Sequence, residues 1–106
     1  MHALVAAADR KVILIGAEDV VFAAPLAWRA VLPLSTRISF YPLRKVAARR
    51  SSGLRWPIEG LVMEGGVQIG VSNETALEAV EAEFAERGVV TILPRACLPN
   101  VISSLQ

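Results

Sequence analysis

The sequence has one cysteine, one histidine and few charged residues, and these shortages exclude several kinds of site. A single thiol, Cys97, cannot form an internal disulfide, which fits a reducing compartment. Nothing around Cys97 is typical of a nucleophile, so we expect a buried thiol. No apolar run reaches the ~20 residues that span a bilayer, and the N-terminus lacks the basic region of a signal peptide. We therefore expect a soluble, cytoplasmic protein.

Phosphate-binding glycine motifs are also missing, of both the P-loop and the dinucleotide type. Adjacent carboxylates at Glu18 and Asp19 follow a strand-ending glycine. They could be imagined as a metal-binding pair, but such a sequence is more often a turn. The chain therefore offers no evident site for a nucleotide.

What the chain has in excess is apolar side chains, at 54% of residues against 20% charged. Its 106 residues are enough for one domain. A domain of this size cannot bury so much apolar surface within itself. We expect part of that surface to contact a partner subunit or a further domain.

The charges nearly cancel, giving a formal net charge of +1, so no global field attracts nucleic acid or membrane. Solvated faces are the simplest interpretation of the local clusters, although the basic one could accept a phosphorylated ligand. Nucleic-acid binding is poorly supported, because Trp56 is the only aromatic residue among the basic residues that could stack on bases. The basic cluster is Arg44, Lys45, Arg49, Arg50 and Arg55, and the acidic one is Glu74, Glu78, Glu81, Glu83 and Glu86.

The hydrophobic pattern predicts short strands separated by turns. A Gly-Gly pair at 65–66 predicts a hairpin between two apolar runs, because such turns need positive φ. Residues 3–8 are expected to be the tail of a helix, and 25–33, with Trp28, mostly irregular. Trp28 itself is expected to be a packing or interface residue. The predicted strands are 11–16, 20–24, 37–43, 61–63, 67–71 and 89–94, with the chain trailing off after the last.

Residues 73–88 support two interpretations. Asn73 could cap a helix that ends at Gly88, with a favourable Ala, Glu and Leu composition. The same residues also alternate, with Val80, Ala82 and Phe84 on one face, which predicts a strand over 79–84. With that strand, the count is about seven, and no long helices alternate with them. The fold class is then all-β, an antiparallel, jelly-roll-like sandwich with a short N-terminal helical remnant.

Trp56 lies in SSGLRWPIEG (51–60), a stretch otherwise composed for a turn. Pro57 disfavours helical backbone at the preceding residue and cannot donate to a sheet, so Trp56 is expected at a strand end or sheet edge. There its indole could stack on a flat or cationic ligand. For an isolated tryptophan, capping of the core is the commoner role. Arg55 is expected to project opposite Trp56 and to face solvent.

The run S-S-G-L-R-W-P-I-E-G, followed by G-V-S-N-E (70–74), resembles the C-terminal thiamine-binding domain of thiamine pyrophosphokinases. The resemblance extends from about Lys11 to Leu93, and it favours the strand at 79–84. It implies a homodimer that transfers diphosphate from ATP to thiamine, giving thiamine diphosphate and AMP. It also implies that Trp56 stacks on thiamine and that Ser72 and Asn73 line the pocket.

The same resemblance implies a division of labour. In the family, ATP and Mg²⁺ are bound by an N-terminal α/β domain, so we expect no cofactor and no catalytic residue in this chain. Residues 1–10 are interpreted as a remnant of that domain and 11–106 as the thiamine-binding sandwich. Alone, the chain is expected to be inactive, since diphosphate transfer needs those parts. The alternative is a non-catalytic β-sandwich module whose task is self-association.

Overall fold

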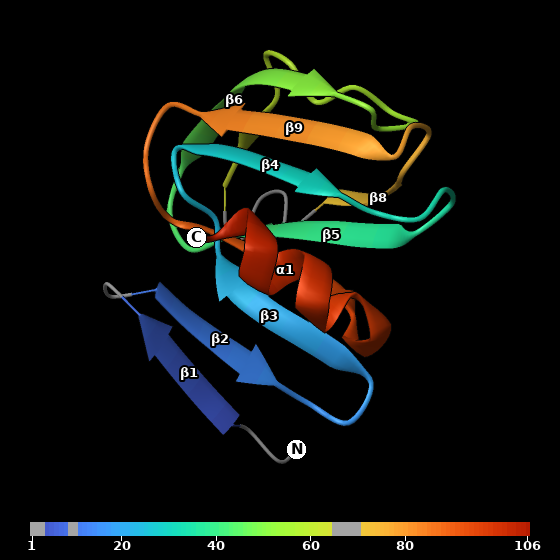
Figure 1. Ribbon diagram of the computed structural model, residues 1–106. Coiled ribbons are helices and arrows are strands. Elements are labelled where there is room, and N and C mark those ends of the chain that lie inside the picture. Colours follow the sequence, from blue (N-terminus) through green and yellow to red (C-terminus); the bar gives the residue numbers. More distant parts are fainter. Residues whose placement is uncertain (1–3, 9–10, 65–70) are drawn as a thin grey trace.

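A computed structural model describes residues 4–8, 11–64 and 71–106. They form two antiparallel sheets packed face to face, with one short helix beside them (Figure 1). The larger sheet has the order β1(Leu4–Ala8), β2(Lys11–Ile15), β3(Asp19–Ala23), β10(Val89–Pro94), β5(Arg37–Pro42), β8(Val71–Glu74). The smaller sheet has the order β4(Ala27–Val31), β9(Ala79–Phe84), β6(Val46–Ser52), β7(Val62–Met63). The predicted antiparallel sandwich is confirmed.

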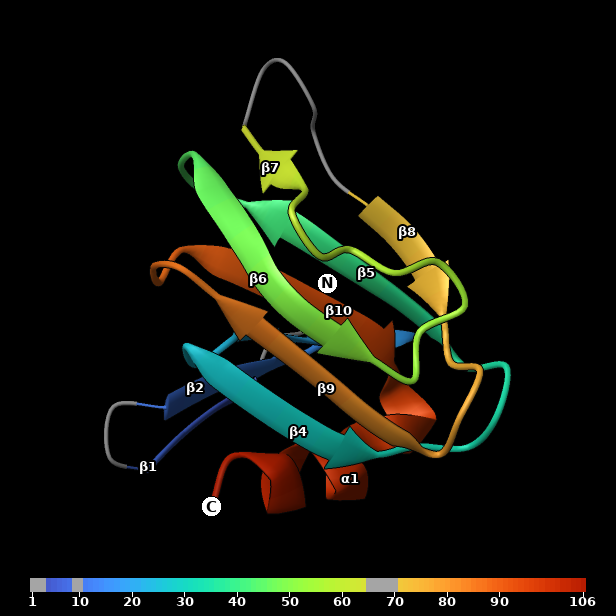
Figure 2. The ribbon, with the colours of Figure 1, turned by 90° about the horizontal axis from the view of Figure 1, so that it is seen from above.

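The core lies between the sheets, and Figure 2 looks down on the smaller sheet with the larger one behind it. Strand alternation supplies it: every second residue of β9 and β10 is buried, because successive side chains of a strand point to opposite faces. Two aromatic pairs join the layers. Phe22 packs on Trp28 with ring centroids 5.5 Å apart, and Phe40 meets Phe84 edge-on at 5.8 Å.

The strand interpretation of the contested segment is confirmed. β9 occupies residues 79–84, with Val80, Ala82 and Phe84 buried. Asn73 does not cap a helix; it lies in β8. Helix propensity is weak relative to tertiary packing, and β9 gains ladder bonds to β4 on one side and β6 on the other.

Three sequence predictions about the rest of the chain are wrong. Residues 4–8 are not a helix tail but β1, which pairs with β2 along its whole length. Trp28 is not in an irregular stretch but in β4, between prolines that lie outside the strand, although its packing role is confirmed by full burial. The chain does not trail off after β10: it forms a 3₁₀ turn, η1(Arg95–Cys97), and a helix, α1(Leu98–Ser104).

Helix α1 exists because it closes the open side of the sandwich at the edge strand β4. Val101 and Leu105 enter the core. Asn100 donates from Nδ2 to the carbonyl of Val31 at 2.7 Å, and Trp28 donates from Nε1 to Ser104 Oγ at 2.9 Å. Such contacts satisfy polar groups at an otherwise exposed sheet edge.

Other local predictions are borne out where they can be checked. Strand 37–42 buries Ile38 and Phe40 and ends at Pro42. β2 and β3 form the predicted hairpin, and Cys97 is buried. The turn at 65–66 lies outside the described residues, and the strands beside it pair elsewhere, β7 with β6 and β8 with β5. The assignment of residues 1–10 to a preceding domain stays a prediction.

Candidate functional site

Residues 53–61, between β6 and β7, form a loop that we call the Trp56 loop. It leaves β6 at Gly53 and passes along the end of β8. Gly53 has a φ of +81°, a left-handed backbone that side chains rarely adopt. A Cβ there would lie 2.2 Å from the carbonyl oxygen of Ala79, so only glycine fits. The Gly53 carbonyl accepts hydrogen bonds from the backbone of Ala76 and Leu77. This glycine therefore fixes how the loop departs from the sheet.

The next residues pair with the end of β8. Leu54 forms an isolated antiparallel bridge with Thr75, and Arg55 donates its N–H to the carbonyl of Glu74 at 2.9 Å. Leu54 is buried, whereas Arg55 is exposed. The loop thus covers the outer edge of β8 and connects the two sheets at this margin.

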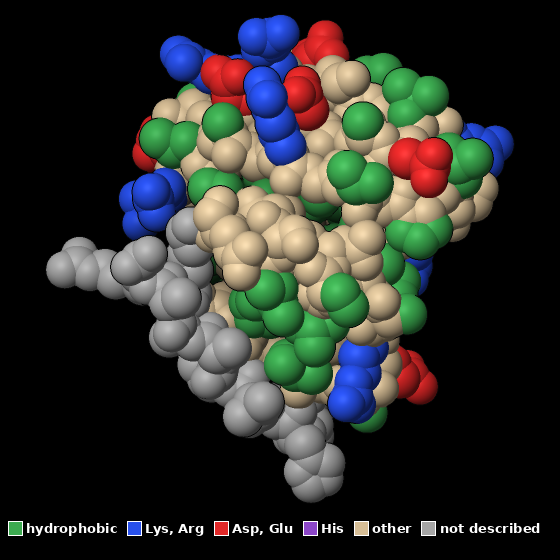
Figure 3. Space-filling view, viewed as in Figure 1, with side chains coloured by type: hydrophobic (Ala, Val, Ile, Leu, Met, Phe, Trp, Pro, Cys, Tyr) green, Lys and Arg blue, Asp and Glu red, His purple; other side chains and the backbone are tan. Residues whose placement is uncertain are grey.

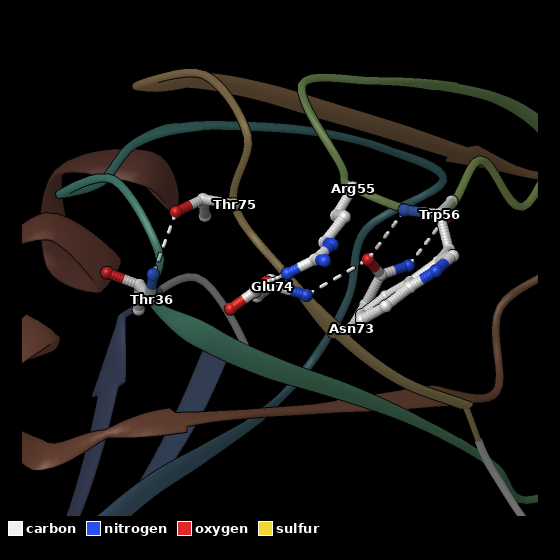
Figure 4. A network of polar contacts seen from close by, with 6 residues as sticks. All are labelled: Thr36, Arg55, Trp56, Asn73, Glu74 and Thr75. Atoms are coloured by element: carbon white, nitrogen blue, oxygen red, sulfur yellow. Dashed lines mark hydrogen bonds and ion pairs between the residues drawn. The ribbon is translucent and has the colours of Figure 1, made fainter.

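Asn73 holds the backbone of Trp56 from inside (Figure 4). Its side chain is almost fully buried, at 3% exposure. Oδ1 accepts from the N–H of Trp56 at 3.1 Å and from that of Glu74 at 2.9 Å, while Nδ2 donates to the carbonyl of Trp56 at 2.6 Å. All three bonds go to backbone groups, so the amide positions the loop.

Two further side chains complete the support of this loop. Ser51 Oγ accepts the N–H of Ile58 at 3.0 Å, as serine hydroxyls in turns commonly do. Thr75 Oγ1 accepts the N–H of Thr36 and donates to the carbonyl of Pro33. Thr75 is buried, so the network extends from the Trp56 loop to the turn before β5.

The indole of Trp56 projects from this fixed backbone and is 52% exposed. Capping of the core, the alternative role, does not describe it. The guanidinium of Arg55 lies over the ring, with Cζ 4.9 Å from its centroid, and pairs through Nη1 with the carboxylate of Glu74. The expectation that Arg55 points away from Trp56 applies to an extended segment and is wrong, because both residues lie in a bend. The expectation that Arg55 faces solvent is confirmed, since its side chain is mostly exposed.

The structure brings two of the three predicted site residues together and separates the third. Trp56 and Asn73 are bonded directly. Ser72 is exposed and stands opposite Ser39 in the β5–β8 register. Since neighbouring residues of a strand point to opposite faces, its hydroxyl projects from the other side of β8 relative to Asn73. Arg55, Glu74 and Thr75 were not predicted as site residues, and only the position of Arg55 beside the tryptophan offered a signal.

Charged side chains elsewhere form mostly solvated surfaces. Figure 3 shows basic and acidic side chains intermixed over β6 and β9, and Arg29 pairs there with Glu81 at 2.8 Å. The carboxylate of Asp19 pairs with Arg37 at 2.8 Å. The backbone carbonyl of Asp19 accepts the N–H of Gly16, as in a turn. Burial raises the pKa of the Cys97 thiol. Within residues 4–8, 11–64 and 71–106, no three His, Cys, Asp or Glu side chains gather as metal ligands would.

A separate groove of about 590 Å³ runs between α1 and strands β4 and β9. Its walls include Val31, Ala79 and Pro99, and none of the predicted site residues. None of the helices in the described part of the chain has the length and apolar character that a bilayer span requires.

Solved structures similar to this chain include two thiamin pyrophosphokinases. The enzyme from Bacillus subtilis is 18% identical, with a TM-score of 0.64 over 79% of this chain and 40% of its own. The enzyme from Geobacillus thermodenitrificans is 15% identical, with a TM-score of 0.64 over 77% and 39%. The chain thus matches about two fifths of each, and these likenesses establish the fold. Curated protein sequences give no significant match.

A family model supplies the assignment. The model described as "Thiamin pyrophosphokinase, vitamin B1 binding domain" matches residues 32–89, more than half of the chain. That range contains the Trp56 loop, β8 and the two hydrogen bonds by which the Asn73 side chain joins them. The chain therefore belongs to the family of thiamin pyrophosphokinase vitamin B1-binding domains.

Proposed function

We propose that the chain binds thiamine at the exposed indole of Trp56, beside the outer edge of β8. In this proposal the chain is the acceptor-binding part of a thiamine pyrophosphokinase. The observation that carries the proposal is the family match over 32–89, which includes both Trp56 and the residue that fixes its backbone. Thiamine combines an aminopyrimidine with a cationic thiazolium. A half-exposed indole suits that ligand, because the ring face attracts cations and stacks on flat rings.

Asn73 and Ser72 have different roles in this proposal. Asn73 is a positioning residue: its amide is occupied by backbone groups of residues 56 and 74, and it acts on thiamine through Trp56. The Ser72 hydroxyl is exposed and would contact thiamine in a pocket completed by another surface. Partner chains or further domains are the natural source of that surface.

The reaction we propose is transfer of diphosphate from ATP to the hydroxyl of thiamine, giving thiamine diphosphate and AMP. ATP and Mg²⁺ belong to a separate α/β domain in this proposal, as the resemblance to thiamine pyrophosphokinases implies. The contribution of this chain is to hold the hydroxyl where the donor can meet it, which is catalysis by proximity. Alone, the chain would not turn over ATP.

A second copy of the chain is the proposed partner, and a reducing cytoplasm the proposed location. Exposed apolar side chains support self-association, which is also the alternative function of the module. Among the aliphatic side chains that the structure describes, those exposed most are Val31, Leu34, Leu43 and Leu77. Sedimentation over a range of protein concentrations tests this point independently of ligand.

Calorimetric titration with thiamine tests the binding proposal, on this chain and on the longest protein that contains it. We expect binding that Trp56→Ala weakens by about tenfold or more, since stacking and cation–π contacts are lost. Tyr41→Ala is the matched control, because it removes another exposed aromatic side chain, on β5. Equal affinities of wild type and Trp56→Ala would refute the proposed site. No binding by either protein, with Trp56→Ala dissociating into monomers, would favour the self-association module.

A further inference from the structure

The face of Trp56 that a cationic ligand would use already carries a cation. The Arg55 guanidinium lies 4.9 Å from the ring centroid, within the ~6 Å range of cation–π attraction. Its other contact is the Glu74 carboxylate, so the side chain is held between a ring and an anion. Both partners are fixed by Asn73, whose Oδ1 accepts the backbone N–H of each.

A thiazolium ring and this guanidinium cannot occupy the same indole face. If the ligand took the opposite face, two positive charges would share one ring about 7–9 Å apart, which weakens binding by roughly 2- to 10-fold. Glu74 offsets part of this repulsion, because its negative charge is paired with Arg55 and partly cancels that charge. Its side chain is 29% exposed and that of Arg55 61%, so solvent screens the pair only partly.

For a phosphorylated ligand the sign reverses. A guanidinium presents a planar fork of donors that binds phosphate oxygens in pairs. Arg55 is mostly exposed and sits beside the ring, where a diphosphate on the stacked ligand could reach it. The same residue that opposes free thiamine therefore favours its phosphorylated form.

Resting on the proposed function, we infer that Arg55 is a specificity-determining residue that sets the relative affinity of this site for thiamine and thiamine diphosphate. Glu74 moderates it by sharing the guanidinium. Arg55 and Glu74 thus control the ratio of the dissociation constants for thiamine and thiamine diphosphate. They do so without needing to contact the pyrimidine ring.

Calorimetry with three probes tests the inference: thiamine, thiamine diphosphate without metal, and the neutral aminopyrimidine alcohol that corresponds to half of thiamine. In Arg55→Met we expect thiamine to bind about 3- to 10-fold more tightly and thiamine diphosphate more weakly by a similar factor. The neutral probe should change by less than about twofold. Arg55→Lys should keep the order of the three affinities that the wild type has. Glu74→Gln should favour thiamine diphosphate over thiamine more strongly than the wild type does.

Arg29→Met is the matched control, since Arg29 is an exposed arginine paired with Glu81 on the four-stranded sheet. It should leave all three affinities unchanged. An unchanged thiamine to thiamine diphosphate ratio in Arg55→Met and Glu74→Gln would overturn the inference while leaving thiamine binding established. Equal changes for all three probes would also overturn it, because a structural effect does not depend on ligand charge. Failure of wild type to bind any probe would overturn the proposed function itself.

Discussion

Replacing Asn73 by alanine removes three hydrogen bonds from a buried site and leaves three backbone groups without those partners. Each such bond contributes about 1 kcal/mol net, and an unsatisfied buried group costs about 1–3 kcal/mol. Water can reach some of these groups once the loop loosens. We therefore expect Asn73→Ala to lower the free energy of unfolding by about 2–4 kcal/mol. For a domain of this size, each kcal/mol corresponds to about 4–8 °C in Tm.

Urea denaturation measures this loss, and acrylamide quenching of tryptophan fluorescence shows where it acts. Trp28 is buried, so added quenching in the folded variant reports on Trp56. Ser72→Ala is the matched control: Ser72 is next to Asn73 in β8 but is exposed, so the change should stay within about 0.5 kcal/mol. A loss below about 0.5 kcal/mol in Asn73→Ala, with unchanged quenching, would refute the positioning role.

Asn73→Asp refines the test because it keeps the shape and the accepting oxygen. Its second oxygen would face the Trp56 carbonyl that Nδ2 now contacts at 2.6 Å. The two N–H groups that donate to the first oxygen favour the charged form, whereas burial and that carbonyl disfavour it. We expect the second pair of effects to be larger, so that the pKa of the new carboxyl rises on folding. Protonation then stabilises the fold, and this stability is lost as pH rises through the raised pKa. The variant should fall further below wild type at pH 7.5 than at pH 4, and a gap independent of pH would contradict the geometry.

Three further outcomes follow from other residues. Gly53→Ala should destabilise the domain by more than about 2 kcal/mol, because the backbone is left-handed and a Cβ would lie 2.2 Å from the Ala79 carbonyl oxygen. Urea denaturation measures the loss of stability. A loss no larger than that of an exposed substitution would contradict this expectation. Trp28→Phe should cost about 1–3 kcal/mol through the lost bond to Ser104 Oγ and the smaller ring, with thermal unfolding as the measurement. Burial raises the pKa of Cys97, so its alkylation at pH 8 should be slow until denaturant is added, and rapid reaction of folded protein would refute that burial.

Much of the sandwich could be predicted because alternation is local. Ile38 and Phe40, or Val80 and Phe84, announce a buried face within six residues, and the structure buries them. β1 and α1 could not be predicted in this way. Residues 4–8 have a helix-forming composition and become a strand only by pairing with β2. α1 is too short to be stable alone and depends on contacts with β4.

The site divides along the same line. The position of Trp56 at the margin of a sheet follows from Pro57, which cannot donate to a sheet, whereas the sequence left open whether its ring is exposed or caps the core. Its link to Asn73 spans 17 positions, and no local pattern reports which buried amide will bond to which backbone. Arg55 was misplaced for a related reason: alternation holds in a strand, and the loop bends where Arg55 and Trp56 lie.

The most direct measurement is an NMR titration with thiamine that follows the two indole N–H signals of the folded chain. Trp28 serves as an internal reference, because it is buried and its Nε1–H is bonded to Ser104. A saturable shift of the Trp56 signal, with that of Trp28 unmoved, is the expected result. If neither signal moves while thiamine binds, or if only Trp28 responds, the vitamin is held elsewhere and the exposed indole is not its site.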